Sequence, residues 1–248
     1  MKKRLDQLLV DRGLTDNKSR AQALVLAGSV FSGERRLDKP GTPLAEDIAL
    51  EVRGAPHPYV SRGGLKLVQA LDHFAFDPGG LVALDVGAST GGFTDVLLQR
   101  GAAKVYAVDV GHGQLAWKLR SDPRVVVIER FNIRNVTAQQ ISEPPGAIVC
   151  DVSFIGLQTA LPAALALAAP GAFLAALIKP QFEAGRGQVG KGGIVRDPAL
   201  HQEVCQRIGA WLADRPGWQV LGITPSPISG ADGNLEFLIG ARFEGGQG

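Results

Sequence analysis

The chain has 248 residues, 45% of them hydrophobic and 20% charged, which is typical of a globular protein with one large domain or a large and a small one. Its two cysteines exclude a disulfide framework, and neither they nor the four histidines have metal-ligand spacing. We therefore expect no bound metal and a reducing, cytoplasmic setting. The charged start, MKKRLDQLLVDRG, lacks the apolar segment of a secretory signal, so none is expected.

The net charge of +2 is unevenly distributed. Residues 1–66 hold 12 Lys and Arg against 8 Asp and Glu, a net charge of +4, whereas residues 67–248 hold 14 against 16, a net charge of −2. A basic segment on a nearly neutral body favours a polyanionic partner for that segment. A solvated charged surface is the alternative that charge alone leaves open.

A stretch without charged residues, 152–178, is 27 residues long and exceeds the length that a membrane span needs. Pro162 and the pair Pro170-Gly171 interrupt it. The stretch is therefore predicted to be a helix, a turn and a buried strand rather than a membrane span.

The first predicted elements are two short helices within residues 4–27, separated by Gly13. Thr15 or Asp16 is expected to cap the second helix. Short strands are expected within residues 29–37 and 47–54. Eight cations are expected on the exposed face of this region: Lys2, Lys3, Arg4, Arg12, Lys18, Arg20, Arg35 and Arg36.

The run RLDQLLVDRG, followed by SRAQALVLAGSVFSG, resembles the S-four-type RNA-binding domain over about residues 3–55. The resemblance implies a small α+β domain over residues 1–56, joined by a linker at 57–62. It also implies recognition of folded RNA through phosphates and shape, because the major groove of A-form RNA is too narrow for direct reading. The cations expected to contact RNA here are Lys3, Arg4, Arg12, Lys18 and Arg20.

Strands and helices then alternate, which predicts a doubly wound α/β sheet over residues 63–248. An amphipathic helix is expected first, at 63–74. Strands are expected at 81–86, 103–110, 124–129, 146–152, 172–179, 218–224 and 235–243. Helices are expected at 93–100, 113–120, 137–142, 157–168 and 199–214.

LDVGASTGG, residues 84–92, places a carboxylate and three glycines at a turn from strand to helix. Gly87 permits the tight turn, and Gly91 and Gly92 let a ligand approach the backbone at a helix N-terminus. The spacing is Asp-x-Gly-x-x-x-Gly-Gly, which differs from the G-x-G-x-x-G of dinucleotide sites. A glycine-rich turn alone is weak evidence for any particular ligand, because dinucleotide sites use the same architecture.

Three polar residues near this turn bear on the cofactor. Asp109 follows the second strand, where a carboxylate binds ribose hydroxyls in NAD and S-adenosylmethionine sites alike. Asp85 favours S-adenosylmethionine, whose amine needs an anionic surrounding. Asn132 follows the third strand and either reaches adenine or caps a loop. The expected cofactor residues are Asp85, Gly87, Ala88, Ser89, Thr90, Gly91, Gly92, Phe93, Asp109, Asn132 and Asp151.

In ALIKPQFEAG, residues 176–185, a buried strand ends with Lys179, which the following proline holds in an extended conformation. Asp151 follows the neighbouring strand, at the edge where open α/β sheets bind ligands. Lys66 lies on the first helix of this region, and Glu236 begins the last strand. Each residue alone is as well explained by an ordinary salt bridge, but together they predict a site.

This quartet, DVGASTGGF and KPQFEAGRGQVGKGGIVRD together resemble the FtsJ-like RNA 2′-O-methyltransferases, and within them the TlyA or hemolysin-A-type subfamily. The resemblance implies a Rossmann-like fold and methyl transfer from S-adenosylmethionine to a ribose 2′-hydroxyl, typically of a ribosomal RNA cytidine. The family's catalytic Lys-Asp-Lys-Glu tetrad maps onto Lys66, Asp151, Lys179 and Glu236.

The chemistry points to Lys179 as the base or the positioner of the hydroxyl. The sulfonium donor is highly activated, so the enzyme must mainly align the reacting atoms and manage one proton. A lysine acts as a base only when desolvation or a neighbouring cation brings its pKa toward the working pH. Lys66 supplies such a cation, whereas Asp151 and Glu236 oppose the shift and are expected to orient the lysines.

The glycine-rich segment 183–197 is interpreted as a mobile lid over RNA and cofactor, with an unstructured connection as the alternative. Ser61 and Arg62 are expected near the target phosphate, and Phe154 is expected to stack on a flipped base. The cations expected to contact RNA in this part of the chain are Arg62, Arg186 and Lys191.

Three other functions stay open at this point. A non-enzymatic RNA-binding or ribosome-assembly factor would keep the basic segment but not need the cofactor turn and the quartet. A membrane-active hemolysin would need a span that the sequence does not favour. A NAD-dependent oxidoreductase would use the same sheet with another cofactor.

Overall fold

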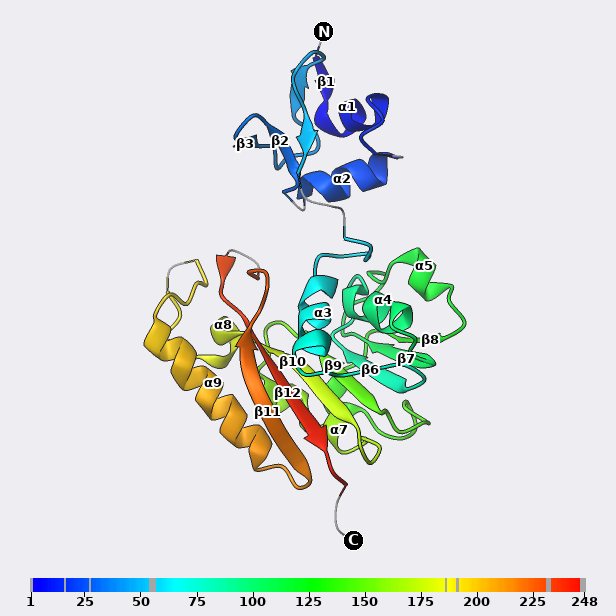
Figure 1. The fold of residues 1–248 in the computed structure, drawn as a ribbon, viewed down its shortest axis with the longest axis vertical. Coiled ribbons are helices and arrows are strands. Elements are labelled where there is room, and N and C mark those ends of the chain that lie inside the picture. The colour runs from blue at the N-terminus through cyan, green and yellow to red at the C-terminus, as the bar shows by residue number, and fades with distance from the viewer. Residues whose placement is uncertain are drawn as a thin grey trace. The chain divides into compact units, whose positions relative to one another are not determined.

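The computed structural model describes residues 2–15, 17–26, 28–53, 57–185, 187–190, 192–230 and 233–245. The chain divides into two compact units, Met1–Pro58 and Tyr59–Gly248 (Figure 1). The division falls within the segment 57–62 that the sequence analysis assigns to a linker. Each unit has its own hydrophobic core and is described by itself.

The first unit packs two helices on two small sheets. The helices are α1, Leu5–Asp11, and α2, Lys18–Leu26. One sheet pairs β1, Lys2–Arg4, with β4, Pro43–Ala45; the other has the order β3-β2-β5, with β2 at Val30–Ser32, β3 at Arg35–Arg36 and β5 at Glu51–Val52. The core consists of Leu5, Leu9, Ala21, Val25, Val30 and Leu37.

Two details of this unit differ from the sequence prediction. The sheet of β1 and β4 was not expected, because three-residue strands with charged or turn-forming residues carry little pattern. The cap of α2 is Asn17, whose Oδ1 accepts a hydrogen bond from the amide of Arg20 at 2.9 Å. Thr15 instead bonds to Asn17, and Asp16 lies outside the described residues.

The second unit is built on a seven-stranded sheet with the order β11-β12-β10-β9-β6-β7-β8. Five neighbouring strands are parallel, and β12 runs antiparallel between β10 and β11. This is the doubly wound, Rossmann-like sheet that the sequence predicts. The strands are β6, Val82–Val86; β7, Lys104–Val108; β8, Val125–Ile128; β9, Ala147–Cys150; β10, Phe173–Ile178; β11, Trp218–Pro225; and β12, Phe237–Phe243.

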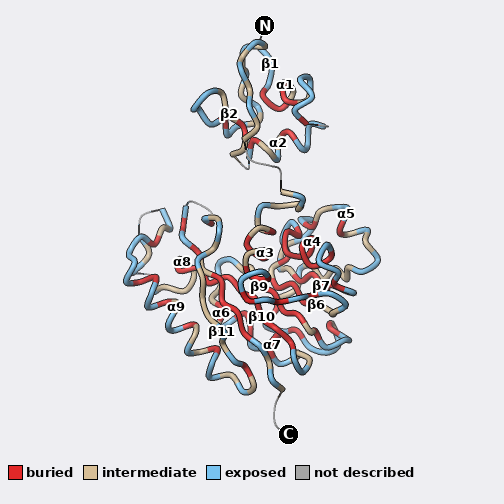
Figure 2. Tube along the Cα trace, in the orientation of Figure 1, coloured by how far each residue is buried: buried red, intermediate tan, exposed pale blue. Residues whose placement is uncertain are grey.

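Helices cover both faces of this sheet, and the buried residues form a separate core on each face (Figure 2). One face is covered by α3, Gly64–His73; α4, Gly92–Gln99; and α5, Trp117–Arg120. The other is covered by the 3-10 helix η1, Ile133–Asn135; α6, Leu157–Ala160; α7, Pro162–Leu165; and α9, Pro198–Ala213. A single turn, α8, Pro180–Glu183, follows β10.

Three predicted helices are wrong. Of the helix expected at 113–120, only Trp117–Arg120 is helical. Residues 137–142 form a turn in which the backbone amide and hydroxyl of Thr137 both bond to the side chain of Gln140. The helix expected at 157–168 divides into α6 and α7, because Pro162 cannot continue α6 and begins α7 instead.

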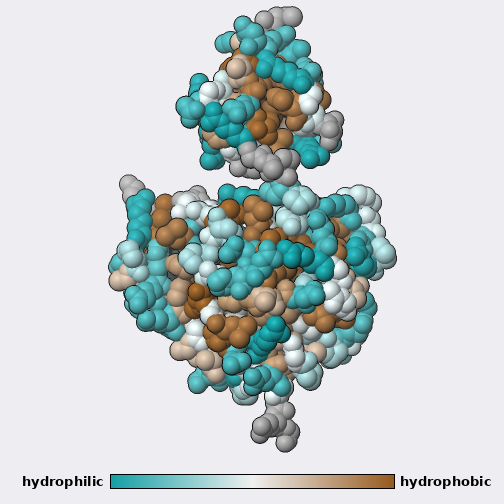
Figure 3. All heavy atoms as spheres, viewed as in Figure 1, coloured by the Kyte–Doolittle hydropathy of each residue, from teal (hydrophilic) through white to brown (hydrophobic). Residues whose placement is uncertain are grey.

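The uncharged stretch 152–178 holds α6, α7 and the buried strand β10. Within the described residues, no helix has both the length and the apolar character that crossing a membrane requires. On the face drawn in Figure 3, hydrophobic areas of the second unit are interspersed with hydrophilic side chains.

Candidate active site

The glycine turn joins β6 to α4 and needs its glycines for two reasons. Gly87 and Gly91 have φ angles of 86° and 98°, a region that side chains rarely adopt. A Cβ on Gly87 would also lie 2.7 Å from the carbonyl oxygen of Asp151, so the turn passes close to the end of β9. The sequence thereby places backbone amides and the Asp151 loop at one edge of the sheet.

Two cavities lie at this edge. The larger has a volume of about 440 Å³ and the smaller about 160 Å³. Both are lined by Gly87, Ser89, Asp151 and Ser153, so they meet at the turn. The larger adds Asp109, Gln114, Phe131, Asn132 and Phe154, among others, and the smaller adds Ser61, Ala88, Thr90, Gly92, Phe93 and Lys179.

Asp85 lies fully buried beneath the turn and lines neither cavity. Its Oδ2 accepts a hydrogen bond from Thr94 Oγ1 at 2.6 Å, and no described residue bonds to its Oδ1. Burial raises the pKa of this carboxyl to about 7. An unpartnered carboxyl oxygen beneath a ligand turn fits a cation bound above it.

Asp109 fixes the turn and borders the larger cavity. Its Oδ2 accepts a hydrogen bond from the amide of Ser89 at 2.8 Å, and its Oδ1 accepts one from the amide of Gly111 at 2.6 Å. Each oxygen keeps a lone pair that can accept from a hydroxyl. The end of β7 and the glycine turn therefore act as one binding edge.

Asn132 borders the same cavity and also caps η1. Its Oδ1 accepts hydrogen bonds at 3.1 Å from both the amide and the Nε of Arg134. The loop-cap role that the sequence left open is thus present for the oxygen. A role of the amide nitrogen toward adenine stays a prediction.

The four predicted catalytic residues form one chain of alternating charge, in which Lys66, Lys179 and Glu236 are buried and Asp151 is partly exposed. Lys179 Nζ lies 2.5 Å from Asp151 Oδ1, and the other oxygen of Asp151 lies 3.8 Å from Lys66 Nζ. Lys66 Nζ in turn lies 2.5 Å from Glu236 Oε2. Two lysines and two carboxylates together have no formal net charge, which lowers the cost of burying them.

Different elements bring these side chains together. Lys66 comes from α3, Asp151 follows β9, Lys179 follows β10 and Glu236 precedes β12. A Cβ on Gly64 would lie 3.1 Å from the carbonyl oxygen of Gly92, so the first turns of α3 and α4 approach closely there. That approach places Lys66 beside the glycine turn.

Sequence reasoning missed several residues that support this chain. Ser153 Oγ accepts a hydrogen bond from Lys179 Nζ at 3.0 Å and borders both cavities. Gly230 leaves space for Glu236, because a Cβ there would overlap its carboxylate. The only signal for Ser153 is its place in DVSF, and for Gly230 there is none, because its partner lies across a loop.

The residues expected to contact the target nucleotide differ in how well the structure places them. Ser61 borders the smaller cavity, and Arg62 is exposed next to it in sequence. Phe154 is 90% exposed at the larger cavity with a φ of 66°, and its ring centroid lies 5.0 Å from that of Phe182. Arg186 and Lys191 lie outside the described residues.

In the first unit, several predicted RNA-contacting cations have intramolecular partners, Lys3, Arg4 and Arg12 among them. Lys3 pairs with Asp11 at 3.1 Å, Arg4 pairs with Asp6 at 2.8 Å, and Arg12 donates to the backbone carbonyls of Glu46 and Ile48. Lys18 and Arg20 are exposed, as are Arg35 and Arg36 of β3.

Comparisons with known proteins agree with this site. The sequence model of the FtsJ-like methyltransferase family matches residues 59–243. YqxC of Bacillus subtilis, labelled an rRNA methyltransferase, is 50% identical over 98% of this chain and 87% of its own. The 16S/23S rRNA (cytidine-2′-O)-methyltransferase TlyA of Mycobacterium tuberculosis is 46% identical over 97% of this chain and 90% of its own.

A solved structure from Streptococcus thermophilus, labelled a hemolysin, superposes with a TM-score of 0.78. It is 43% identical and covers 99% of this chain and 90% of its own. The family match spans the glycine turn and the whole quartet. The chain belongs to the FtsJ-like methyltransferase family.

Proposed function

We propose that the chain is an RNA 2′-O-methyltransferase that transfers a methyl group from S-adenosylmethionine to a ribose 2′-hydroxyl of ribosomal RNA, most often of a cytidine. The observation that carries the proposal is the Lys179–Asp151–Lys66–Glu236 chain, whose Lys179 end borders the smaller cavity beside the glycine turn. The activities named for YqxC and TlyA support the RNA substrate.

The two cavities fit the two halves of the cofactor. The larger suits adenosine, with Asp109 accepting from the ribose hydroxyls and Asn132 facing the base. The smaller suits the methionine part, which the turn amides and the charge of Asp85 would hold. When bound, S-adenosylmethionine supplies a methyl group activated by its sulfonium.

The protein's own residues then position the nucleophile and remove one proton. Lys179 Nζ reaches the cavity between Asp151 and Ser153, where a ribose 2′-oxygen can meet it. Lys179 is the residue that would accept the hydroxyl proton, a role that requires its amine to be neutral at that step. Lys66 and Glu236 hold Asp151 in place, so the amine keeps one orientation.

Recognition of RNA is assigned to both units. The first unit, as an S-four-type domain, supplies phosphate contacts through its exposed cations, Lys18, Arg20, Arg35 and Arg36. In the second, Arg62 and Phe154 serve the target nucleotide, and Arg186 and Lys191 remain candidates by sequence. The setting in which ribosomal RNA is modified would be the cytoplasm.

The test is tritium transfer from methyl-labelled S-adenosylmethionine to separated ribosomal subunits from cells that lack the modification. Lys179→Met should lower transfer by about a hundredfold or more, because it removes the only proposed base. Lys104→Met is the control, since Lys104 pairs with Glu143 on the surface. It should methylate like the wild type.

The outcomes separate the alternatives. Calorimetry should give cofactor affinities that agree within about twofold for all three proteins. A twofold change in affinity corresponds to less than about half a kcal/mol. Cofactor binding without label in either subunit would favour the assembly-factor function instead. Leakage of liposomes on addition of pure protein would favour the hemolysin function.

A further inference from the structure

Asn234 is a buried polar residue in the loop before β12, only 3% exposed, that the quartet itself does not include. Its Oδ1 accepts a hydrogen bond from the amide of Val195 at 3.0 Å. Its Nδ2 donates to the carbonyl of Gly193 at 3.0 Å. The side-chain amide therefore pairs with the glycine-rich segment as the peptide group of a neighbouring strand would.

This pairing needs an amide. A carboxylate of the same size keeps the acceptor for Val195 but loses the donor to Gly193, and it buries a charge beside a carbonyl oxygen. From the other side, the buried His201 of α9 bonds through Nε2 to the carbonyl of Val195 at 3.1 Å. Residues 193–195 are thus held between α9 and the loop of Asn234.

The same loop positions Glu236. The carbonyl of Asn234 accepts a hydrogen bond from the amide of Gly230 at 2.9 Å, and Gly230 is the residue that leaves space for the Glu236 carboxylate. The carbonyl of Glu236 accepts from the amide of Ser226 at 2.9 Å. These contacts among the described residues of the loop connect Asn234 with Gly230, which lies against the carboxylate that contacts Lys66.

We propose that Asn234 is a positioning residue that holds Glu236 against Lys66 by fastening the Glu236 loop to residues 193–195. The proposal rests on the proposed function and adds to it a structural link between residues 193–195 and Glu236. Loss of Asn234 should impair methyl transfer without impairing the cofactor site, whose lining comes from other loops.

The first arm of the test needs no activity. The Lys66 Cε signal is followed by NMR in the full chain with 13C-labelled lysine and assigned by its absence in Lys66→Arg. Glu236→Gln defines the position of this signal when the ion pair is weakened. Asn234→Ala and Asn234→Asp should both move the signal toward that position, and an unmoved signal would overturn the proposal.

Asp197→Ala is the matched control. Asp197, two residues after Val195, caps α9 by accepting a hydrogen bond from the amide of Ala199 at 2.9 Å. Its cap bond is to α9 and not to a described residue of the Glu236 loop. The substitution removes one side-chain hydrogen bond from the segment that joins residues 193–195 to α9. The Lys66 signal should stay in place in this variant, whereas an equal shift would show a general loosening and contradict a specific role for Asn234.

The second arm measures methyl transfer and cofactor affinity. Asn234→Ala should lower kcat by about tenfold or more with cofactor Kd within about twofold, because misplacing a positioning group affects the chemical step. A parallel loss of cofactor affinity would contradict the proposal. If the wild type itself fails to methylate ribosomal RNA, the proposed function is wrong and the NMR arm alone decides the role of Asn234.

Discussion

Asp85 is the residue at which the cofactor site should respond to pH. Burial raises its pKa to about 7, so in the free protein it is protonated below that pH. The bound cofactor is cationic and favours the ionised carboxylate of Asp85. Binding of the cofactor therefore competes with protonation of this carboxylate. Cofactor affinity should therefore rise with pH up to about 7 and level off above it.

Calorimetry between pH 5.5 and 8.5 checks this expectation. The slope below the pKa should approach but not exceed about tenfold per pH unit, the limit for release of one proton. Asp85→Asn should bind more weakly at high pH and show a flat profile. The sign reverses for stability without cofactor: a raised carboxyl pKa stabilises the fold at low pH, and that contribution is lost as pH rises through about 7.

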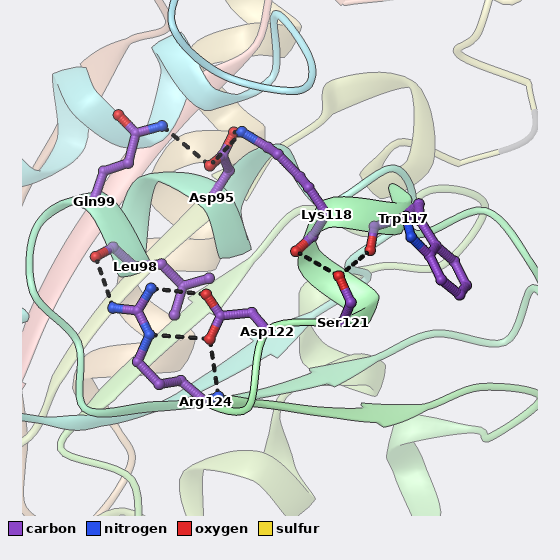
Figure 4. Close-up of polar contacts among 8 residues, drawn as sticks. All are labelled: Asp95, Leu98, Gln99, Trp117, Lys118, Ser121, Asp122 and Arg124. Carbon is purple, nitrogen blue, oxygen red and sulfur yellow. Dashed lines mark hydrogen bonds and ion pairs between the residues drawn. The ribbon is translucent and has the colours of Figure 1, made fainter.

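Among the helices, α4 has a second role besides ending the glycine turn. Asp95, in its first turn, accepts a hydrogen bond from the amide of Val60 at 2.8 Å and from Gln99 Nε2 at 3.0 Å. Lys118 of α5 pairs with the same carboxylate at 2.9 Å (Figure 4). α4 thereby anchors both α5 and the segment that brings Ser61 to the smaller cavity.

Asp95→Asn should weaken cofactor binding by about five- to tenfold. Removing the charge of a buried, hydrogen-bonded carboxylate costs on the order of 1–3 kcal/mol, and only part of that cost should fall on cofactor binding. The control is Asp122→Asn in the same view (Figure 4). Asp122 also pairs with a cation and accepts a backbone amide, both from Arg124, but it borders neither cavity. Equal losses in the two variants would show that Asp95 acts only through general stability.

The elements that the sequence predicts well are those with a buried pattern. β9 and β10 are continuous apolar runs, and β6 is apolar except for Asp85; each is followed by a turn-forming or charged residue, so their bounds agree with the prediction within about two residues. Residues 137–142 look helical by composition, but the side chains of Thr137 and Gln140 close a turn on their own backbone. Such local bonds compete with a helix and leave no periodic signal.

For the site, sequence reasoning found the charged groups but not what supports them. Lys179 and Asp151 follow adjacent strands, so the topology of an α/β sheet is enough to bring them together. Ser153, Gly230 and Asn234 act through contacts between loops, which depend on tertiary packing. A single sequence contains no information on those contacts beyond the residue types.

At the scale of the whole molecule, the two units differ in charge. In our proposal the first unit binds RNA and the second unit transfers the methyl group. Residues 1–58 hold 10 Lys and Arg against 8 Asp and Glu, and Lys3, Arg4 and Arg12 are among the cations with partners within the unit. We expect the remaining exposed cations to supply salt-dependent affinity for RNA, because each phosphate contact releases counterions.

Deleting residues 1–58 should therefore raise KM for ribosomal RNA strongly at low salt and less at high salt. A plot of the logarithm of the RNA-binding constant against the logarithm of the salt concentration should be steeper for the full chain than for the shortened chain. The two slopes should differ by about 0.7–0.9 for every phosphate contact that the first unit makes. Cofactor Kd of the shortened chain, measured in parallel, tests whether the second unit is still folded. Equal slopes for the two proteins would contradict an RNA-binding role of the first unit.

The position of β12 has a consequence for how the protein is made. This strand is inserted between β10 and β11, and the residue before it, Glu236, meets Lys66 from 170 positions earlier in the chain. During synthesis, Lys66, Asp151 and Lys179 emerge first, and Lys66 has no Glu236 to pair with until β12 enters the sheet. A chain that ends before β12 thus lacks both its antiparallel strand and the fourth charged residue of the quartet. An enzyme that acts on ribosomal RNA would in this way become competent only after its own translation by a ribosome has reached the last strand.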